Sequence, residues 1–265
     1  MWFITPHFLV GGPSMIQSLL RASQLLECFD DQHSELGIVQ LGRMTGLNKS
    51  TVHHLVATLC AAGLLDKTSA HRYRLNLHIL TLGSRVMARL EVGGVADPVL
   101  RQLQATLQET IHLAVSENLT AVYIIKFESP RSIAMISRVG RGVPLHCSGV
   151  GKILLAYNTR LLSDVLSHEL ISYTPSTITS EHELSDHLHT VRRQGYAIDD
   201  GEISDGLMCI AAPVYNYANK VVAAVSASGP RQRMRAYPLA AIIAEVKRAA
   251  QAVSSEMGYG LIKHL

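Results

Sequence analysis

Residues 41–65 read LGRMTGLNKSTVHHLVATLCAAGLL and decide how the N-terminal part of the chain folds. A short helix is predicted over residues 39–44, and Gly46 supplies the tight turn after it because glycine accepts backbone angles that other residues avoid. Asn48 is a favourable helix start, since its side chain can accept a hydrogen bond from a backbone N–H of the first turn. Gly63 ends the second helix. Two short helices joined by a glycine turn predict a helix–turn–helix.

The second of these helices has two unlike faces. Its apolar stripe is narrow and consists of Val52, Leu55, Val56 and Leu59. The opposite face and its flanks carry small or hydrogen-bonding side chains, namely Ser50, Thr51, His53, His54 and Ala57. Such a face can enter the major groove of DNA without steric clash, so this helix is the candidate recognition helix.

The stretch that follows predicts a β-hairpin wing. Residues 71–75 read HRYRL, and the alternation of a strand turns Tyr73 and Leu75 inward and Arg72 and Arg74 outward. The two arginines would then follow a phosphate backbone. An ordinary three-helix bundle with a solvated basic hairpin is the alternative structure for the same pattern.

The positive charge of the chain is concentrated in this region. The 265 residues carry a formal net charge of +3, and 48% of them are apolar, which excludes a disordered or fibrous protein. Residues 43–89 hold seven Lys or Arg and a single acid, Asp66. A basic block in an otherwise balanced chain favours a polyanion, and with the helix–turn–helix the expected partner is double-stranded DNA.

Cysteine usage and the lack of long apolar runs exclude several other classes of protein. The four cysteines have no paired spacing, so neither a disulfide framework nor a zinc site is expected, and the expected compartment is a reducing cytoplasm. They are Cys28, Cys60, Cys147 and Cys209. No apolar run can span a bilayer, so no membrane partner is expected. Residues 1–14 are uncharged and are expected to form a loosely ordered tail, with Met15 as an alternative start.

Helices and strands alternate in the rest of the chain, which predicts an α+β protein. A helix over residues 76–90 is followed by a break at residues 91–98, where two glycines and a proline occur. Further helices are predicted over residues 99–109, 149–156, 181–194 and 239–257. Strands are predicted over residues 111–115, 121–127, 132–136, 196–199, 208–214 and 221–228. The expected domains are the tail at 1–14, a winged helix–turn–helix at 15–76, a linker helix at 77–97 and an effector-binding domain at 98–265.

Several polar groups of the second domain are expected to converge on a small-molecule pocket. The backbone N–H groups of Gly149 and Val150 begin a helix, and such an end attracts a carboxylate. Ser226 and Ser228 lie two apart on a strand, so both hydroxyls face one side. Cys209 and Asp199 lie on two further strands. A tight strand-to-helix turn and hydroxyls satisfied in the core are the alternative roles of these residues.

The same residues allow other functions. Cys209 or Ser148 could be the nucleophile of an enzyme acting on a small acid, with His146 as base, but no sequence signature of a nucleophile surrounds Cys209. A pure oligomerisation or protein-docking module is a third hypothesis. His182, Asp186 and His189 share a helix face whose polarity favours solvation over metal binding. No catalytic residue, metal or cofactor is therefore expected.

Five separated motifs together resemble the IclR family of bacterial transcriptional regulators. Besides residues 41–65 and the wing HRYRL, they are VGRGVPLHCSGVGKILLA (139–156), GYAIDDGEISDGLMCIAAPV (195–214) and AAVSASGP (223–230). The resemblance implies a winged helix–turn–helix joined by a linker helix to a GAF-like ligand-binding domain. It also implies a non-enzymatic cytoplasmic regulator of metabolic genes that forms homodimers or dimers of dimers on palindromic operators and responds to a small molecule, commonly a carboxylate.

The resemblance also assigns roles to individual positions. The implied DNA-binding residues are Arg21, Lys49, Ser50, Thr51, His53, His54, Arg72 and Arg74, with Lys49 and the arginines on phosphates. The implied ligand-binding residues are Gly149, Val150, Asp199, Cys209, Ser226 and Ser228. The chain departs from the family pattern at His54, where the family usually has Arg, and at Gly201, which replaces a common acid.

Overall fold

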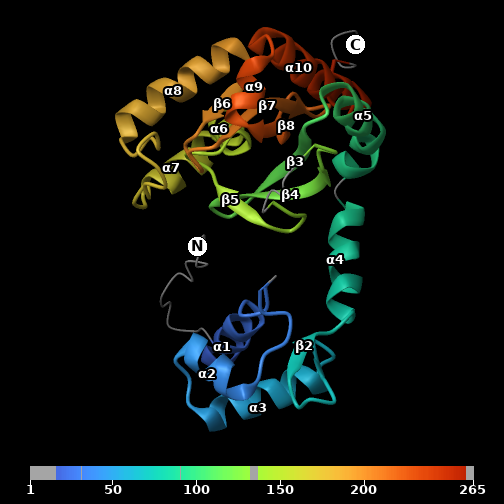
Figure 1. Cartoon of the computed structure of the whole chain (residues 1–265), viewed down its shortest axis with the longest axis vertical. Helices are drawn as coiled ribbons and strands as arrows, with labels where there is room; N and C mark the ends of the chain where they lie inside the picture. The colour runs from blue at the N-terminus through green and yellow to red at the C-terminus, as the bar shows by residue number, and fades with distance from the viewer. Residues whose placement is uncertain (1–15, 31, 90, 132–136, 261–265) are drawn as a thin grey trace. The chain divides into compact units, whose positions relative to one another are not determined.

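The computed structural model describes residues 16–30, 32–89, 91–131 and 137–260, which form two compact units that divide near residue 90 (Figure 1). The expected tail at 1–14 and the expected strand at 132–136 lie outside the described residues. The division falls inside the segment 77–97 that the sequence assigned to a linker helix. In the described part of the chain, no helix has both the length and the apolarity needed to cross a bilayer.

The first unit contains the predicted helices and wing. Its elements are α1 (Gln17–Leu26), α2 (Ile38–Thr45), α3 (Lys49–Ala61), β1 (Leu65–Lys67), β2 (Tyr73–Leu75) and α4 (His78–Arg89). The side chains that form its core come from all of these except α4, and they include Leu25, Leu41, Val52, Val56, Leu65 and Tyr73. The wing strands pair antiparallel. Tyr73 also exchanges two backbone hydrogen bonds with Leu36, of 2.8 and 2.9 Å, which holds the wing against the helices.

Three residues of the opening motif act as the sequence predicts. Gly46 has φ of 71° between α2 and α3, a left-handed angle that glycine adopts without strain. The Asn48 side chain accepts a hydrogen bond of 2.9 Å from the N–H of the third residue of α3. Gly63 has φ of 70°, and the N–H of Leu64 donates to the carbonyl oxygen of Leu59 at 2.8 Å, which closes the helix end.

The predicted orientation of Leu75 is wrong. Its side chain is 41% exposed, whereas Tyr73 on the same strand is buried. Leu65 and Tyr73 are the wing side chains that pack into the core, whereas Leu75, the last residue of β2, stays uncovered.

The second unit is built around an antiparallel sheet. Its helices are α5 (Glu91–Leu107), α6 (Gly149–Ala156), α7 (Thr159–Leu166), α8 (Glu181–Gln194), α9 (Arg231–Ala236) and α10 (Leu239–Glu256). Its strands are β3 (Thr110–Glu117), β4 (Thr120–Phe127), β5 (Gly142–Pro144), β6 (Ala197–Asp200), β7 (Leu207–Tyr215) and β8 (Val221–Pro230). Among the described residues the strand order is β5-β4-β3-β8-β7-β6. The α+β fold class is therefore confirmed.

The predicted break at residues 91–98 is wrong, because α5 runs through it with Pro98 inside the helix. Val92, Ala96 and Leu100 follow one another at intervals of four residues and are buried against the sheet. Pro98 lies on the exposed side of the helix, as does Gly94, whose carbonyl oxygen loses its intrahelical N–H partner and can be hydrated instead. Burial of the apolar stripe therefore outweighs the weak helix propensity of the two glycines and the proline.

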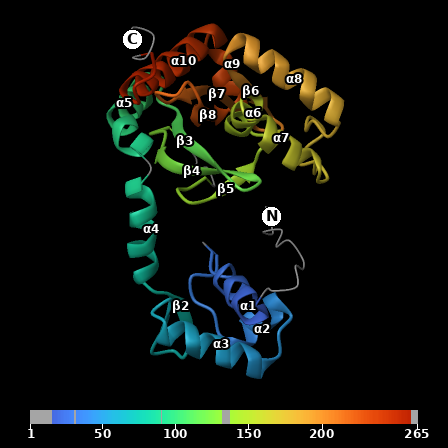
Figure 2. The ribbon, with the colours of Figure 1, turned by 180° about the vertical axis from the view of Figure 1, so that it is seen from behind.

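Helices cover both faces of the sheet (Figures 1 and 2). Helices α5 and α10 pack on one face, against large side chains such as Ile111, Leu113 and Ile210. Helices α6, α7 and α8 pack on the other face, which has small residues in the central strands, including Ala211 and Ala224. Small side chains on this second face leave room beside α6, and the pocket described below lies there.

Candidate functional site

Helix α3 presents an unburied face in the first unit. Lys49, Ser50, His53 and His54 are exposed, and Thr51 is half-buried. The Ser50 hydroxyl donates to the Asn48 side-chain oxygen at 3.1 Å, so it also takes part in the start of the helix. This face has the exposure and the small side chains that entry into a major groove requires.

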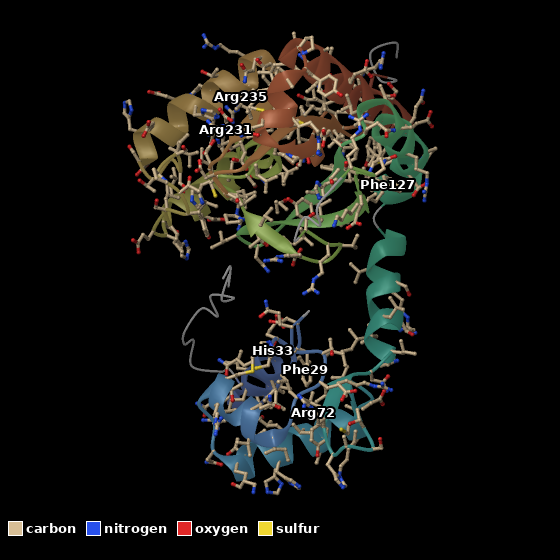
Figure 3. The ribbon with its side chains drawn as sticks, in the orientation of Figure 1. Phe29, His33, Arg72, Phe127, Arg231 and Arg235 are labelled. Carbon is tan, nitrogen blue, oxygen red and sulfur yellow. The ribbon has the colours of Figure 1, made fainter. Side chains whose placement is uncertain are left out.

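The two arginines of the wing lie in different surroundings. Arg74 is exposed, and its guanidinium lies 4.0 Å from the Asp66 carboxylate. Arg72 does not project outward as predicted, because its guanidinium donates to the backbone oxygen of Glu35 and to the Gln40 side chain (Figure 3). Arg72 thus fastens the wing to the segment before α2. Arg21, on α1, is half-buried.

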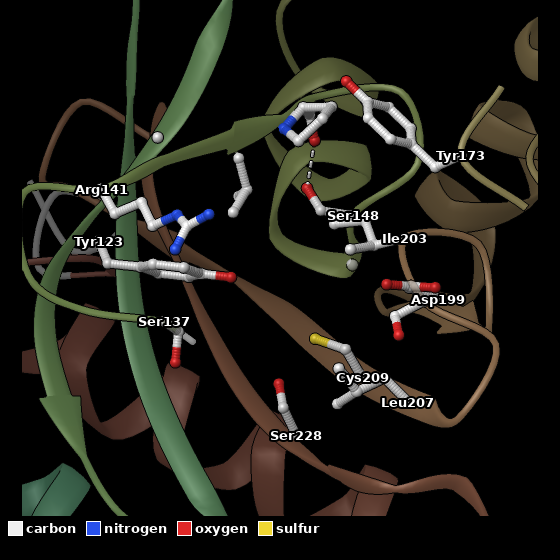
Figure 4. Close-up of a pocket in the computed structure, with 15 residues that line it drawn as sticks. Tyr123, Ser137, Arg141, Ser148, Tyr173, Asp199, Ile203, Leu207, Cys209 and Ser228 are labelled. Carbon is white, nitrogen blue, oxygen red and sulfur yellow. Dashed lines mark hydrogen bonds between the residues drawn. The ribbon is translucent and has the colours of Figure 1, made fainter. Parts of the chain in front are cut away.

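The second unit contains a cavity of about 170 Å³, which is bordered by the start of α6 and by the loop that follows β6 (Figure 4). Polar and apolar side chains share its walls. The lining residues are Tyr123, Ser137, Arg141, Gly142, Val143, Pro144, Ser148, Gly149, Tyr173, Asp199, Ile203, Ser204, Leu207, Cys209 and Ser228.

Four of the six residues expected at a ligand site line this cavity: Gly149, Asp199, Cys209 and Ser228. The strand register explains why three of them meet, since Asp199 pairs with Cys209 and Cys209 pairs with Ser228 across neighbouring strands. The other two residues, Val150 and Ser226, are buried behind the wall and do not line the cavity.

The turn into α6 fixes one wall of the cavity. Ser148 precedes the helix, and its hydroxyl donates to the Pro144 carbonyl oxygen at 2.5 Å and accepts from the Gly151 N–H at 3.0 Å. A Cβ added at Gly149 would lie 2.9 Å from the Cys209 sulfur, so this position has no space for a side chain. The start of α6 is therefore pressed against β7.

Buried charges lie behind the Asp199 end of the cavity. The fully buried Lys152 ammonium forms an ion pair with Glu202 and donates to the Ile198 carbonyl oxygen at 3.2 Å. One Asp199 oxygen accepts the N–H of Glu202 at 2.7 Å. Burial raises the pKa of Asp199 to about 7, and the Glu202 carboxylate adds to this rise. Burial and Asp199 raise the pKa of the Cys209 thiol to about 11.

The residues on the opposite wall, among them Tyr123, Ser137, Arg141 and Tyr173, were not among the expected site residues. Arg141 lies inside the 139–156 motif, and its place in that motif is the signal that the sequence offers. No local pattern predicts that Arg141 faces the cavity, because the neighbouring strand β5 has only three residues. β5 and β6 are the two edges of the described sheet, so both edges border one pocket only through the curl of the whole sheet.

The enzyme alternative is not supported at this site. The Cys209 thiol is kept protonated by its raised pKa, whereas a nucleophilic cysteine needs a lowered one. The Ser148 hydroxyl is already engaged in two hydrogen bonds at the start of α6, one to the Pro144 carbonyl oxygen and one from the Gly151 N–H. His146, the imagined base, hydrogen-bonds through Nε2 to the Ile171 carbonyl oxygen at 3.0 Å.

Two protein-family models match the chain and together span most of it. The model described as the IclR helix-turn-helix domain matches residues 18–69. The model described as the bacterial transcriptional regulator IclR C-terminal matches residues 84–255.

Known proteins resemble the chain over nearly its whole length. The HTH-type transcriptional regulators XynR and KdgR of Escherichia coli are 33% and 34% identical to it. XynR matches over 92% of this chain and 98% of its own, and KdgR over 93% and 95%. A crystal structure of an IclR homolog complexed with 4-hydroxybenzoate, from Microbacterium hydrocarbonoxydans, superposes with a TM-score of 0.80 at 26% identity and covers 91% of this chain and 98% of its own. The chain belongs to the IclR family of bacterial transcriptional regulators.

Proposed function

We propose that this regulator binds operator DNA through its N-terminal unit and that a small carboxylic acid in the C-terminal cavity modulates this binding. One observation carries the proposal: a single chain combines an exposed helix–turn–helix face on α3 with a cavity that is lined by an arginine. The 4-hydroxybenzoate in the solved relative supports an acid as the effector. A metabolite regulates only if its affinity differs between DNA-competent and DNA-incompetent states.

The DNA contacts divide into base-facing and phosphate-facing residues. Ser50, Thr51, His53 and His54 face base edges or adjacent phosphates. Lys49, Arg74 and Arg21 contact phosphates and set the register. Arg72 contributes to DNA binding indirectly, because its hydrogen bonds to Glu35 and Gln40 hold the wing in place.

The chain acts as a homodimer, or as a pair of dimers, on a palindromic operator. Helix α4 has large exposed side chains along one face, with Leu82 at 40% and Val86 at 59% exposure. Ile16 and Leu19 are also exposed at the start of α1. Apolar surface of this kind marks an interface between proteins, and a second copy of the chain supplies a matching one.

The protein works in the bacterial cytoplasm and is not an enzyme. Four unpaired cysteines fit a reducing compartment. The protonated Cys209 thiol and the occupied Ser148 hydroxyl favour binding over chemistry in the cavity.

The test is the mobility of DNA fragments upstream of the protein's own and neighbouring genes, at several salt concentrations, with and without pools of carboxylic acids. We expect a sequence-selective shift that one pool alters. Lys49→Ala and Arg74→Ala should each weaken binding to all sequences and lower the salt slope by about one unit, because each removes one phosphate contact.

Lys220→Ala is the matched control, since Lys220 is an exposed lysine of the C-terminal unit. It should leave both the affinity and the salt slope unchanged. No selective shift with any fragment, or equal losses in all three variants, would refute the DNA-binding assignment.

A further inference from the structure

Two opposite charges face the cavity from opposite walls. Among its described lining residues, Arg141 and Asp199 are the charged side chains. Arg141 precedes β5 and Asp199 lies on β6, and these strands are the two edges of the described sheet. Figure 4 shows the Arg141 guanidinium over the Tyr123 ring and Asp199 on the other side, with Cys209 and Ser228 between them. A ligand that fills the cavity therefore meets a cation at one end and a carboxylate at the other.

The Arg141 end suits an anion. The backbone here is held in the sheet, since the Tyr123 N–H donates to the Arg141 carbonyl oxygen at 3.2 Å and the Arg141 N–H donates to the Arg138 carbonyl oxygen at 3.1 Å. A guanidinium presents two parallel N–H groups that match the two oxygens of a carboxylate. Arg141 is half-buried, so an ion pair here is less screened by water than one on the surface.

The Asp199 end suits a hydrogen-bond donor. Asp199 is only 4% exposed, and the nearby Lys152 is already paired with Glu202. A second anion placed beside Asp199 would be repelled in a poorly hydrated site, as the effect of Glu202 on the pKa of Asp199 already indicates. A hydroxyl can instead donate to a carboxylate oxygen of Asp199.

The start of α6 is the competing position for an anion. Its N-terminal partial charge attracts carboxylates. However, Gly149 lies against Cys209, which pairs with Asp199, so an anion there would approach the Asp199 carboxylate. Val150, the second expected donor, does not line the cavity. The full charge of Arg141, far from Asp199, is the better site.

We propose that the effector is a hydroxycarboxylic acid bound in one orientation, with its carboxylate on Arg141 and a hydroxyl on Asp199. The proposal rests on the proposed function and specifies both the chemical class of the effector and its direction in the pocket. Arg141 and Asp199 then determine specificity separately, each for one end of the ligand.

The test uses the full-length protein and ligands that differ at one end only. The first set is 4-hydroxybenzoate, benzoate and 4-hydroxybenzamide, and the second is 4-hydroxybutanoate, butanoate and 4-hydroxybutanamide. Calorimetry measures the affinity of each for the wild type, Asp199→Asn and Arg141→Gln. Asn keeps an oxygen for the Glu202 N–H, and Arg138→Gln is the control because Arg138 is exposed and does not line the cavity.

We expect the wild type to prefer one of the hydroxy acids over both of its analogues by about tenfold or more, the worth of one hydrogen bond to a charged group. Asp199→Asn should remove the preference for the hydroxyl and keep the preference for the carboxylate over the amide. Arg141→Gln should do the reverse. Arg138→Gln should change neither ratio.

Several results would overturn the proposal. If either variant changes both preferences together while circular dichroism shows a folded protein, the orientation is wrong. If no hydroxy acid of either set binds, or if acids without a hydroxyl bind equally well, the class is wrong. In these cases an operator shift that still responds to other acids leaves the proposed function intact, whereas the absence of any operator shift refutes that function whatever the calorimetry shows.

Discussion

At the scale of single residues, Gly151 controls the start of α6. A Cβ at this position would lie 2.5 Å from both the Leu145 Cα and the Ser148 Oγ, which is shorter than folded proteins tolerate. The backbone of Leu145 is held at the end of β5 and cannot move aside cheaply. We expect Gly151→Ala to lower the free energy of unfolding by about 1–3 kcal/mol or more, as in overpacked cores, with urea unfolding as the measurement.

Gly94→Ala is the matched control, because Gly94 is also helical but has open space around it. This change should leave the protein as stable as before or stabilise it by up to about 1 kcal/mol through helix propensity. Equal destabilisation by the two alanines would contradict the steric explanation.

A second residue, His112, supports the pocket from behind. It is fully buried, and its ring stacks on Tyr123 with 4.3 Å between ring centroids. Its Nε2 hydrogen-bonds to the Ser137 hydroxyl at 2.9 Å. Burial and the charge of Lys126 lower the pKa of His112 to about 3. His112 therefore stays neutral while it orients two groups that line the cavity.

This lowered pKa predicts a pH dependence of stability. Between pH 6.5 and 3 the unfolded chain binds a proton at His112 that the folded protein does not, so stability falls as the pH falls below 6.5. Between pH 6.5 and 5 the wild type should lose about 2 kcal/mol more than His112→Phe, measured by urea unfolding at both pH values. The opposite effect of Asp199, whose pKa is raised, is present in both proteins and cancels in the comparison. Parallel pH profiles would show that His112 is not the group responsible.

Some site residues could be predicted from sequence and others could not. Ser228 follows from strand periodicity, because alternate residues share a face, whereas Asp199 and Cys209 follow from the resemblance to the family. Ser226 lies two residues before Ser228 on the same face of β8, but it is buried and does not line the cavity. The alternation of a strand predicts which face a residue shares and does not predict where along that face a cavity ends. Arg141 depends on the pairing of distant strands, which no local pattern encodes.

At the scale of elements, α5 shows where local rules fail. Glycine and proline predict a break when a helix stands alone, but tertiary packing supplies most helical stability in a folded protein. Val92, Ala96 and Leu100 recur every four residues, which is a helical spacing, and all three are buried. Burial of this stripe therefore outweighs the local tendency of glycine and proline to break the helix.

Helix α4 makes a second prediction at this scale. Its apolar face contains Leu82 and Val86, which lie one turn apart and are both exposed in the single chain. If a second copy covers this face, Val86→Glu buries a charge in the interface and should weaken self-association by about tenfold or more. Sedimentation velocity over a range of concentrations measures this, and operator affinity should fall with it.

Ser84→Glu is the control on the opposite face of α4, where a charge stays in solvent. It should leave the association unchanged. An unaltered dimer in Val86→Glu would place the interface elsewhere.

At the scale of the whole molecule, the two proposed sites are linked thermodynamically. If an acid changes operator affinity by a given factor, operator DNA must change the affinity for that acid by the same factor. Titrating the protein with the acid in the presence and absence of saturating operator DNA measures this factor directly. Acid affinity that is unaffected by DNA, with operator affinity that still responds to the acid, would mean that the acid acts outside the binding equilibrium.

The overall organisation was the most predictable level. The helix–turn–helix, its wing and an α+β second unit follow from residue periodicity and turn chemistry, and they agree with the structure. The short elements β5, α7 and α9 were not predicted, because segments of this length carry little periodicity.

The pairing of β3 with β8 bears on how the protein is made. β3 is the first strand of the second unit and β8 the last along the chain, yet they are hydrogen-bonded neighbours, with Thr110 opposite Ser228. Ribosomes deliver a chain from its N-terminus, and such distant pairing is slow to form. A nascent chain can thus fold its DNA-binding unit before β8, the strand that pairs with β3, has been synthesised. Synthesis from the N-terminus therefore favours folding of the DNA-binding unit before the second unit is complete.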